Sequence, residues 1–413
     1  MMLLTVKEYD RLHIRRERNL SAHAISQEDG ERLASIRIKD TPVFRYGNRC
    51  LVAQHWVGMV SLPDFSIEIL PKIYGGTSAA NLRRVLLRMI LVSRKIPPRR
   101  HLNASVCLQR QALSEFLIET FLYELGVYCQ SGLQHSYRNV KGNLDKIKGR
   151  ILFNQQFKRN ILNPTRFYCR YTRYSEDCDL NRFFKSCLLL AGEITRDTAN
   201  SKRIEELLSY FDGISEISRE DAKALFISFT LVNAHAETAY QYGRLLLDGL
   251  GATFHVGSTR LSTMLFDMNQ LYELFIYRTA EKIYKHRIIY QKRGNYMVYR
   301  NSDHQHFISL RPDLTLLVDA NTKWIIDTKW KILRSFAKEG DVYQMNAYAD
   351  AIPYVKKVIL LYPKTEGCEH ILGRYTMNTS IGESHPLEIK AVDVMQCLEW
   401  QGFLHYFQRL IEE

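Results

Sequence analysis

The hydrophobic and polar positions of residues 1–77 favour β-structure. Residues 50–60 form a run rich in Val, Leu and Trp, and Phe65–Leu70 alternates apolar with polar side chains. Alternation with a period of two is typical of a strand with one buried face. The segment Leu62–Asp64 favours a turn between the two runs, and Gly75–Gly76 follows the second run. The pattern therefore predicts a small β-rich domain over residues 1–77.

From Asn81 onward the hydrophobic period changes to that of helices. One face of the first helix is formed by apolar side chains at helical spacing, namely Leu82, Val85, Leu86, Met89 and Ile90. The same period predicts further helices over residues 111–130, 179–196, 203–210 and 221–247. Glycines at positions 249 and 251 favour the end of the last helix. We predict a mainly helical region over residues 78–255.

Beyond residue 255, strands and helices alternate. Helical periodicity covers residues 271–286 and 342–351. Strands are predicted over residues 287–291, 296–300, 307–310, 313–318, 323–329 and 355–362, with a further one over residues 387–392. This alternation is typical of a sheet with helices packed on it. The fold class that we predict is a multidomain α+β protein whose third domain, residues 256–413, is of the α/β type.

The charge of the chain points to a polyanionic partner. Lys and Arg total 57 against 44 Asp and Glu, a formal net charge of +13. No acidic residue lies between Glu68 and Glu115, where nine basic residues occur. A second basic run extends from Arg138 to Arg173, with Phe and Tyr side chains interleaved as in surfaces that stack on bases. Both runs are interpreted as contacts to DNA or RNA; the alternative is a solvated helix face with core aromatics.

Composition excludes several classes of protein. The eight cysteines include no C-x-x-C pair, so neither a zinc ribbon nor a disulfide framework is indicated. We find no uninterrupted apolar stretch of membrane-spanning length, and Met1–Leu20 lacks the apolar core of a signal peptide. A basic face could also contact anionic lipid, but the evenly apolar composition favours a nucleic-acid binder. We expect a cytoplasmic protein without a membrane partner.

The chemistry of the chain concentrates in residues 311–329. Two apolar runs flank the turn-forming segment Asp319–Thr322, which predicts a hairpin. Folding the chain back brings Asp313 beside Asp327, and Asp327 and Lys329 lie two apart on one strand face. Adjacent carboxylates raise each other's pKa unless a cation compensates them. Mg²⁺ prefers oxygen ligands and keeps several waters, so the cluster predicts metal-assisted hydrolysis of a phosphodiester, with Lys329 assisting the nucleophile.

These residues carry a resemblance to a known superfamily. Pro312-Asp313 followed by Asp327-Thr328-Lys329 resembles the PD-(D/E)xK nuclease motif, which implies a mixed sheet flanked by helices. The resemblance implies Glu273, on the preceding helix, as an additional metal ligand. Gln344 and Tyr348 lie four apart on the following helix and resemble the Q-x-x-x-Y signature of RecB-type nucleases, which implies a position beside DNA. Mn²⁺ is a possible substitute for Mg²⁺.

Other interpretations of these residues stay open at this stage. Asp313 could be a turn residue at a strand end, and Asp327 could form a surface ion pair with Lys329. Glu273 could be a solvated helix residue. Arg311 could contact phosphate or form a structural salt bridge. His304 and His306 suggest a metal site but lack evident third and fourth ligands.

Motifs along most of the chain resemble the McrC family. They occur in the family's order at residues 57–64, 69–73, 148–151, 174–177 and 181–182, followed by the nuclease motifs. The resemblance implies the nuclease subunit of the McrBC 5-methylcytosine-specific restriction system, whose N-terminal part engages a hexameric AAA+ GTPase, McrB. It also implies stimulation of GTP hydrolysis and cleavage of double-stranded DNA in phage defence. The chain contains no G-x-x-x-x-G-K-[S/T] loop, so we expect no nucleotide cofactor on it.

The hypothesis is a Mg²⁺-dependent endonuclease subunit with metal ligands Asp313, Asp327 and Glu273. Two alternatives stay open, the first of which belongs to a different class of protein. The chain could be chiefly an activator and structural hub for a GTPase ring, since more than half of it lies outside the predicted nuclease core. It could also be a stand-alone RecB-like nuclease acting on DNA ends, as Gln344 and Tyr348 suggest.

Overall fold

The chain folds into a multidomain mixed α/β structure. The computed structural model describes residues 2–17, 19, 23–38, 40–62, 64–73, 78–96, 112–231, 233–249, 254–256, 259–299, 306–334, 336–378 and 384–413. Two compact units are formed, one by Met1–Phe116 with Gly249–Glu413 and the other by Leu117–Asp248. The mixed α/β class expected from the sequence is confirmed, whereas the division at residues 77 and 255 stays a prediction.

A five-stranded sheet lies at the start of the first unit. Its strands in order are β1 (Met2–Lys7), β9 (Phe65–Leu70), β8 (Trp56–Ser61), β14 (Thr259–Asp267) and β13 (Phe254–Val256). β1 runs parallel to β9, and the remaining neighbours are antiparallel. β8 and β14 approach closely at Gly58, where a Cβ atom would lie 2.0 Å from the carbonyl oxygen of Met264. Only glycine fits there, since φ is also +131°.

A smaller sheet completes this β-rich part. It contains β3 (Ala24–Ile25), β2 (Arg11–Ile14), β7 (Cys50–Ala53) and β6 (Phe44–Gly47). Nearby in sequence are helix α1 (Gln27–Ala34) and the short pair β4 (Arg37–Ile38) and β5 (Thr41–Pro42). Both sheets share one core, which includes Leu12, Leu51 and Phe65. The predicted β-rich character of the N-terminal residues is therefore confirmed where the structure describes them; Pro63 and Gly75–Gly76 lie outside the described residues.

A mixed six-stranded sheet forms the rest of the first unit. Its strands in order are β15 (Ile288–Tyr290), β18 (Leu314–Asp319), β19 (Thr322–Thr328), β20 (Val355–Pro363), β22 (Ser384–Val392) and β21 (Gly373–Asn378). Between β15 and β18 in sequence, β16 (Asn295–Tyr299) and β17 (His306–Leu310) form a separate two-stranded antiparallel sheet. The β19–β20 and β20–β22 pairs are parallel and the others antiparallel. The sheet is therefore of the mixed type that the sequence resemblance implies.

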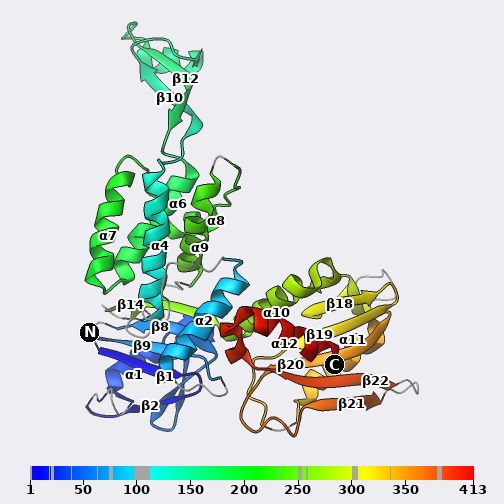
Figure 1. The fold of residues 1–413 in the computed structure, drawn as a ribbon. Helices are drawn as coiled ribbons and strands as arrows, with labels where there is room; N and C mark the ends of the chain where they lie inside the picture. Colours follow the sequence, from blue (N-terminus) through cyan, green and yellow to red (C-terminus); the bar gives the residue numbers. More distant parts are fainter. Residues whose placement is uncertain are drawn as a thin grey trace. The chain divides into compact units, whose positions relative to one another are not determined.

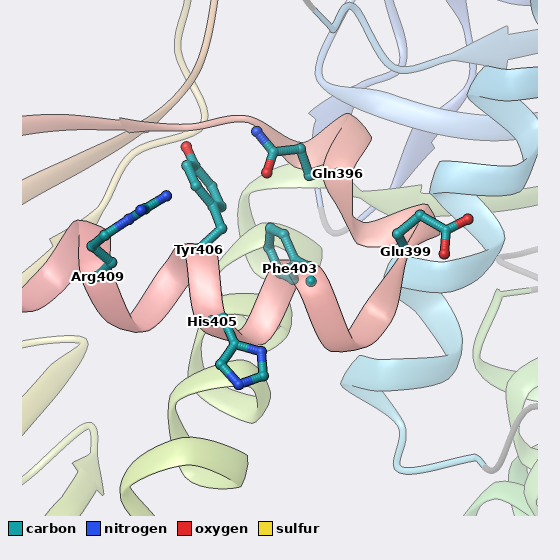
Figure 2. Close-up of a pocket in the computed structure, with 7 residues that line it drawn as sticks. Gln396, Glu399, Phe403, His405, Tyr406 and Arg409 are labelled. Atoms are coloured by element: carbon teal, nitrogen blue, oxygen red, sulfur yellow. The ribbon is translucent and has the colours of Figure 1, made fainter.

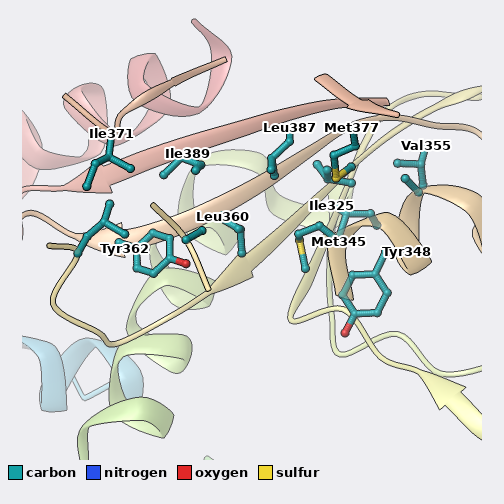
Figure 3. Close-up of a cluster of buried hydrophobic side chains, with 14 of the residues drawn as sticks. Ile325, Met345, Tyr348, Val355, Leu360, Tyr362, Ile371, Met377, Leu387 and Ile389 are labelled. Carbon is teal, nitrogen blue, oxygen red and sulfur yellow. The ribbon is translucent and has the colours of Figure 1, made fainter. Parts of the chain in front are cut away.

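Helices cover both faces of this sheet. On one face α11 (Glu339–Ala351) packs through Met345 and Tyr348 onto Ile325 and Leu360 (Figure 3). On the other face α12 (Trp400–Glu412) receives a hydrogen bond from Lys357, whose Nζ lies 3.3 Å from the Ile411 carbonyl oxygen. α10 (Met268–Tyr284) packs against α12 and against α2 (Ala79–Ser93).

The second unit combines helices with a β arm that extends away from them (Figure 1). Its helices are α4 (Leu113–Gln130), α6 (Asp179–Ile194), α7 (Thr198–Leu208), α8 (Arg219–Ala224) and α9 (Glu237–Gly249). The arm contains β10 (Ser136–Leu144), β11 (Arg150–Ile151), α5 (Phe153–Asn160) and β12 (Phe167–Ser175).

Helices make up most of the described part of residues 78–255, and residues 136–175 add the arm, which the sequence pattern did not predict. The side chains of β10 alternate between half-buried and exposed, so no apolar strand face marks this sheet in the sequence. The single helix expected over residues 221–247 is broken between α8 and α9. Aromatic and β-branched residues from Phe226 to Thr230 continue the apolar pattern but disfavour the helix.

The two basic runs differ in structure. In the first run, Arg83 is buried and its guanidinium forms a hydrogen-bonded ion pair with Glu68, with Nη2 2.7 Å from Oε2. Lys95 pairs with Glu281 at 3.0 Å, and residues 97–111 lie outside the described residues. The second run lies on the arm, where Tyr137 and Phe157 are exposed. In the described part of the chain no helix is both long and apolar enough to span a membrane.

Candidate active site

The β18–β19 hairpin brings the two predicted aspartates together. Leu314 pairs with Ile326 in the antiparallel register, so the residues just outside this pair, Asp313 and Asp327, face each other across the open end of the hairpin. The turn lies at Ala320–Asn321, as the sequence pattern predicts. The predicted hairpin is therefore confirmed.

Asp327 is the most buried polar group of this cluster. Its exposed fraction is 1%, and neither carboxylate oxygen accepts a hydrogen bond from the described residues. Lys329 forms an ion pair with Oδ2, though without the geometry of a hydrogen bond. Burial, together with the charge of Asp313, raises the pKa of Asp327 from 3.8 to about 7. Lys329 lowers the pKa of Asp327, but burial and the Asp313 charge outweigh it, so a further cation beside the two aspartates would stabilise their charged forms.

Asp313 is held by the strand that carries Asp327. Its Oδ2 accepts hydrogen bonds from the Thr328 backbone N–H at 2.7 Å and from Thr328 Oγ1 at 2.8 Å. Burial raises the pKa of Asp313, while these two bonds and the Lys329 charge lower it. Thr328 therefore fixes the orientation of the Asp313 carboxylate relative to Asp327.

Lys329 is linked to the helix that follows the hairpin. Its Nζ donates to Gln344 Oε1 at 3.0 Å, and Gln344 Nε2 donates to the Tyr348 hydroxyl at 2.7 Å. The Tyr348 hydroxyl in turn donates to the Arg311 carbonyl oxygen at 3.1 Å. Burial alone would lower the pKa of Lys329, but Asp327 and Asp313 raise it above its ordinary value. Lys329 is therefore a positively charged group held in one position.

Glu273 joins the same network through a residue that sequence reasoning missed. Gln291 Nε2 donates to Glu273 Oε1 at 2.5 Å, and the exposed Arg311 guanidinium donates to Gln291 Oε1. The Gln291 backbone N–H also donates to the Asp313 carbonyl oxygen at 2.8 Å. Burial and the Asp313 charge raise the pKa of Glu273. The sequence signal was slight, since Gln291 only ends a predicted strand.

All seven predicted site residues are thus connected in one place, at the open end of the hairpin. Lys329, Gln344, Tyr348 and Arg311 form one chain of hydrogen bonds, and Gln291 extends it to Glu273. His304 lies outside the described residues, as does the His306 side chain.

The two aspartates supply the oxygen ligands that a hard divalent cation prefers. The fit rests on Asp327, whose two buried oxygens accept no hydrogen bond within the described part of the chain. Among these residues no group of three or more His, Cys, Asp or Glu side chains is gathered as a metal site. The geometry therefore fits a cation held by Asp313 and Asp327. Glu273 is connected to this pair through its hydrogen bond from Gln291.

A surface pocket of about 720 Å³ lies on α12 and the turn before it (Figure 2). Phe403, Tyr406 and Arg409 are among its lining residues. It contains none of the predicted site residues, so the candidate active site is defined by the hairpin cluster and not by this hollow.

The fold and the cluster define a mixed α/β protein in which a buried and a half-buried aspartate lie beside a lysine at a hairpin end. Residues 51–363 match the family described as McrBC 5-methylcytosine restriction system component. The match spans more than half of the chain, which therefore belongs to this family.

A solved structure shares the fold. A chain of the refined half-complex from a tetradecameric assembly of Thermococcus gammatolerans McrB AAA+ hexamers with bound McrC is similar at a TM-score of 0.66 and 17% identity, over 100% of this chain and 99% of that chain. The cryo-EM structure of the Thermococcus gammatolerans McrBC complex gives a TM-score of 0.49 and 22% identity, over 67% of this chain and 86% of that chain. No curated protein matches this chain.

Proposed function

We propose that the chain is the Mg²⁺-dependent endonuclease subunit of a restriction complex that acts on methylcytosine-containing DNA. The observation that carries the proposal is the buried carboxylate of Asp327 beside Asp313 and Lys329. The six-stranded mixed sheet, with helices on both faces, is then a PD-(D/E)xK nuclease domain. Membership of the McrBC family supports a role in DNA restriction.

Asp313 and Asp327 are the residues that would hold Mg²⁺ or its substitute Mn²⁺, with Glu273 as a further ligand. When bound, such an ion lowers the pKa of a coordinated water and offsets the charge that develops on phosphate oxygens. The protein prepares the ligands in advance. Thr328 orients Asp313 through two hydrogen bonds, and the buried Asp327 carboxylate is paired with Lys329 but accepts no hydrogen bond from the described residues.

Lys329 supplies the positive charge of the proposed reaction. Its raised pKa keeps the ammonium protonated near neutral pH, so it can donate a hydrogen bond to the attacking water or to a phosphate oxygen. Gln344 holds Nζ at 3.0 Å, and Tyr348 holds Gln344, which limits the motion of the ammonium. Arg311 is exposed at the edge of the cluster, where its guanidinium can contact the DNA backbone.

The proposed partners are double-stranded DNA and a hexameric AAA+ GTPase whose GTP hydrolysis the chain stimulates. The similar solved chain comes from an assembly of McrB AAA+ hexamers with bound McrC, which supports the choice of partner. Without a P-loop the chain leaves nucleotide binding and translocation to that partner. Because the proposed complex acts on DNA, the proposed location of the chain is the cytoplasm.

The test compares two conservative substitutions on one hairpin. Asp327→Asn removes the proposed ligand charge, whereas Asp319→Asn makes the same change at the exposed turn, where Asp319 accepts a hydrogen bond from the Asn321 N–H at 2.8 Å. With the partner GTPase, GTP and Mg²⁺, we expect Asp319→Asn to cleave methylated plasmid like the wild type. Asp327→Asn should lose cleavage by at least about 100-fold. Equal cleavage by both variants would refute the proposal.

The second candidate function is that of a GTPase-activating hub with a secondary nuclease. The second unit and its arm favour it, because the arm exposes Phe153, Phe157 and Leu162. Stimulation of the partner's GTPase by Asp327→Asn at the wild-type rate would show that both roles reside in one chain. Robust Mg²⁺-dependent cleavage by the isolated wild-type chain would instead favour the stand-alone RecB-like nuclease.

A further inference from the structure

Trp330 directly follows Lys329 and contacts two elements far from it in sequence. Its side chain is 5% exposed, and its indole N–H donates to both carboxylate oxygens of Glu8 at 3.1 Å. The Trp330 ring also packs on Tyr272, with ring centroids 5.2 Å apart. Tyr272 directly precedes Glu273 on α10, so Trp330 lies next to Lys329 in sequence and contacts the neighbour of Glu273 in space.

Glu8 belongs to the N-terminal sheet. It follows the last residue of β1, its backbone N–H donates to the Leu70 carbonyl oxygen at 2.9 Å, and its Oε2 accepts the Lys72 backbone N–H at 3.1 Å. The side chain is 0% exposed, and no basic side chain forms an ion pair with it among the described residues. Burying a carboxyl group costs free energy, so its hydrogen bond to Trp330 replaces only part of the lost hydration.

A second connection joins the same sheet to the helix that carries Glu273. β14 pairs with β8 in the N-terminal sheet and ends at Asp267, the N-cap of α10. Asp267 Oδ1 accepts the Asn269 N–H at 2.9 Å, and the Met268 N–H donates to the His55 carbonyl oxygen at 3.0 Å. α10 therefore begins where β14 of the N-terminal sheet ends. Glu8, in the same sheet, holds Trp330, which follows the end of β19.

From these contacts we infer that Glu8 and Trp330 are positioning residues that hold Lys329 in its active position and so make cleavage depend on the N-terminal sheet. The inference rests on the proposed nuclease function. Directly after β19, Lys329 contacts α11 through Gln344 and Trp330 contacts α10 through Tyr272. The hydrogen bond of the indole N–H restrains the backbone of Trp330. Because Lys329 is the preceding residue, its Cα and Cβ atoms are restrained as well. A displacement of about 1 Å at a catalytic group lowers the rate about 100-fold.

The test removes the hydrogen bond without removing the ring. Trp330→Phe keeps an aromatic side chain against Tyr272 but has no N–H for Glu8. In the complex with the partner GTPase, we expect kcat for DNA cleavage to fall by about 10- to 100-fold, with KM for DNA and GTPase stimulation unchanged. Glu8→Leu should lose kcat to the same extent. Glu8→Gln keeps an acceptor for the Trp330 and Lys72 N–H groups, so it should retain cleavage within about threefold.

Four outcomes separate this inference from the proposed function. Loss of kcat in Trp330→Phe and Glu8→Leu, with rescue in Glu8→Gln and unfolding temperatures above the assay temperature, supports it. Wild-type kcat in Trp330→Phe, while Asp327→Asn is inactive, overturns the positioning role and leaves the nuclease assignment intact. Full cleavage by Asp327→Asn overturns the nuclease assignment itself. A purely structural role for the bond would lower the unfolding temperature of Trp330→Phe without lowering kcat, and would likewise refute positioning.

Discussion

Substitution of Glu8 by Gln should make the stability of the first unit less sensitive to pH. Burial raises the pKa of Glu8 from its ordinary value of 4.5 to about 8, against the smaller opposing effects of its hydrogen bonds from Lys72 and Trp330. A difference of one in pKa corresponds to about 1.4 kcal/mol, so this rise amounts to up to about 5 kcal/mol. The folded chain keeps the Glu8 proton between pH 4.5 and 8, where the unfolded chain has lost it. Wild-type stability therefore falls through this range as pH increases.

Glutamine has no such proton, so Glu8→Gln should match the wild type near pH 4.5 and exceed it by up to about 5 kcal/mol above pH 8. All four tryptophans of the chain lie in the first unit, so their fluorescence during urea unfolding reports on that unit. Glu28→Gln is the matched control, because the Glu28 side chain is 72% exposed. A stability difference between Glu8→Gln and wild type that stays constant from pH 5 to pH 9 would show that the pKa of Glu8 is not raised in the folded chain.

Three further predictions concern other polar contacts. Arg83→Met leaves Glu68 buried and unpaired and should cost about 3–5 kcal/mol in urea unfolding, most of which the double variant with Glu68→Leu should restore. Hydrogen bonds from Arg182 hold the pKa of Asp177 well below its ordinary range. Asp177→Asn should therefore lower the free energy of unfolding by about 2–3 kcal/mol at pH 7, and this difference from the wild type should disappear only in strong acid. Thermal unfolding followed by circular dichroism measures it. Tyr348→Phe removes the hydroxyl that Gln344 contacts but keeps the ring in the core, so cleavage should fall about tenfold while stability changes by less than about 1.5 kcal/mol.

The centre of the candidate site could be predicted because its information is local. Asp313, Asp327 and Lys329 lie on one hairpin, and the period of two fixes which side chains share a face. Gln344 and Tyr348 lie on the next helix at a spacing of four, and the structure joins both to the hairpin. Local pattern and tertiary structure agree at these positions.

The contacts that support the site could not be predicted in the same way. Glu8 and Trp330 are 322 positions apart, and nothing in either segment marks the other as its partner. Gln291 acts through a side-chain amide whose partners come from a helix and a separate loop. The arm was missed for another reason, since its strands expose both polar and aromatic side chains and lack the apolar alternation that identifies strands. Long-range pairing and solvated sheets therefore need the folded structure.

Calorimetric titration of the chain with Mg²⁺ measures whether Asp313 and Asp327 form a divalent-cation site. The Asp327 oxygens are buried without hydrogen-bond partners among the described residues, so the wild type should bind Mg²⁺ and release protons, because the pKa of Asp327 is raised to about 7. Asp319→Asn should bind Mg²⁺ equally, and Asp327→Asn should show no binding heat at this site. Equal Mg²⁺ binding by Asp327→Asn and the wild type would show that Asp327 is not a ligand of the cation.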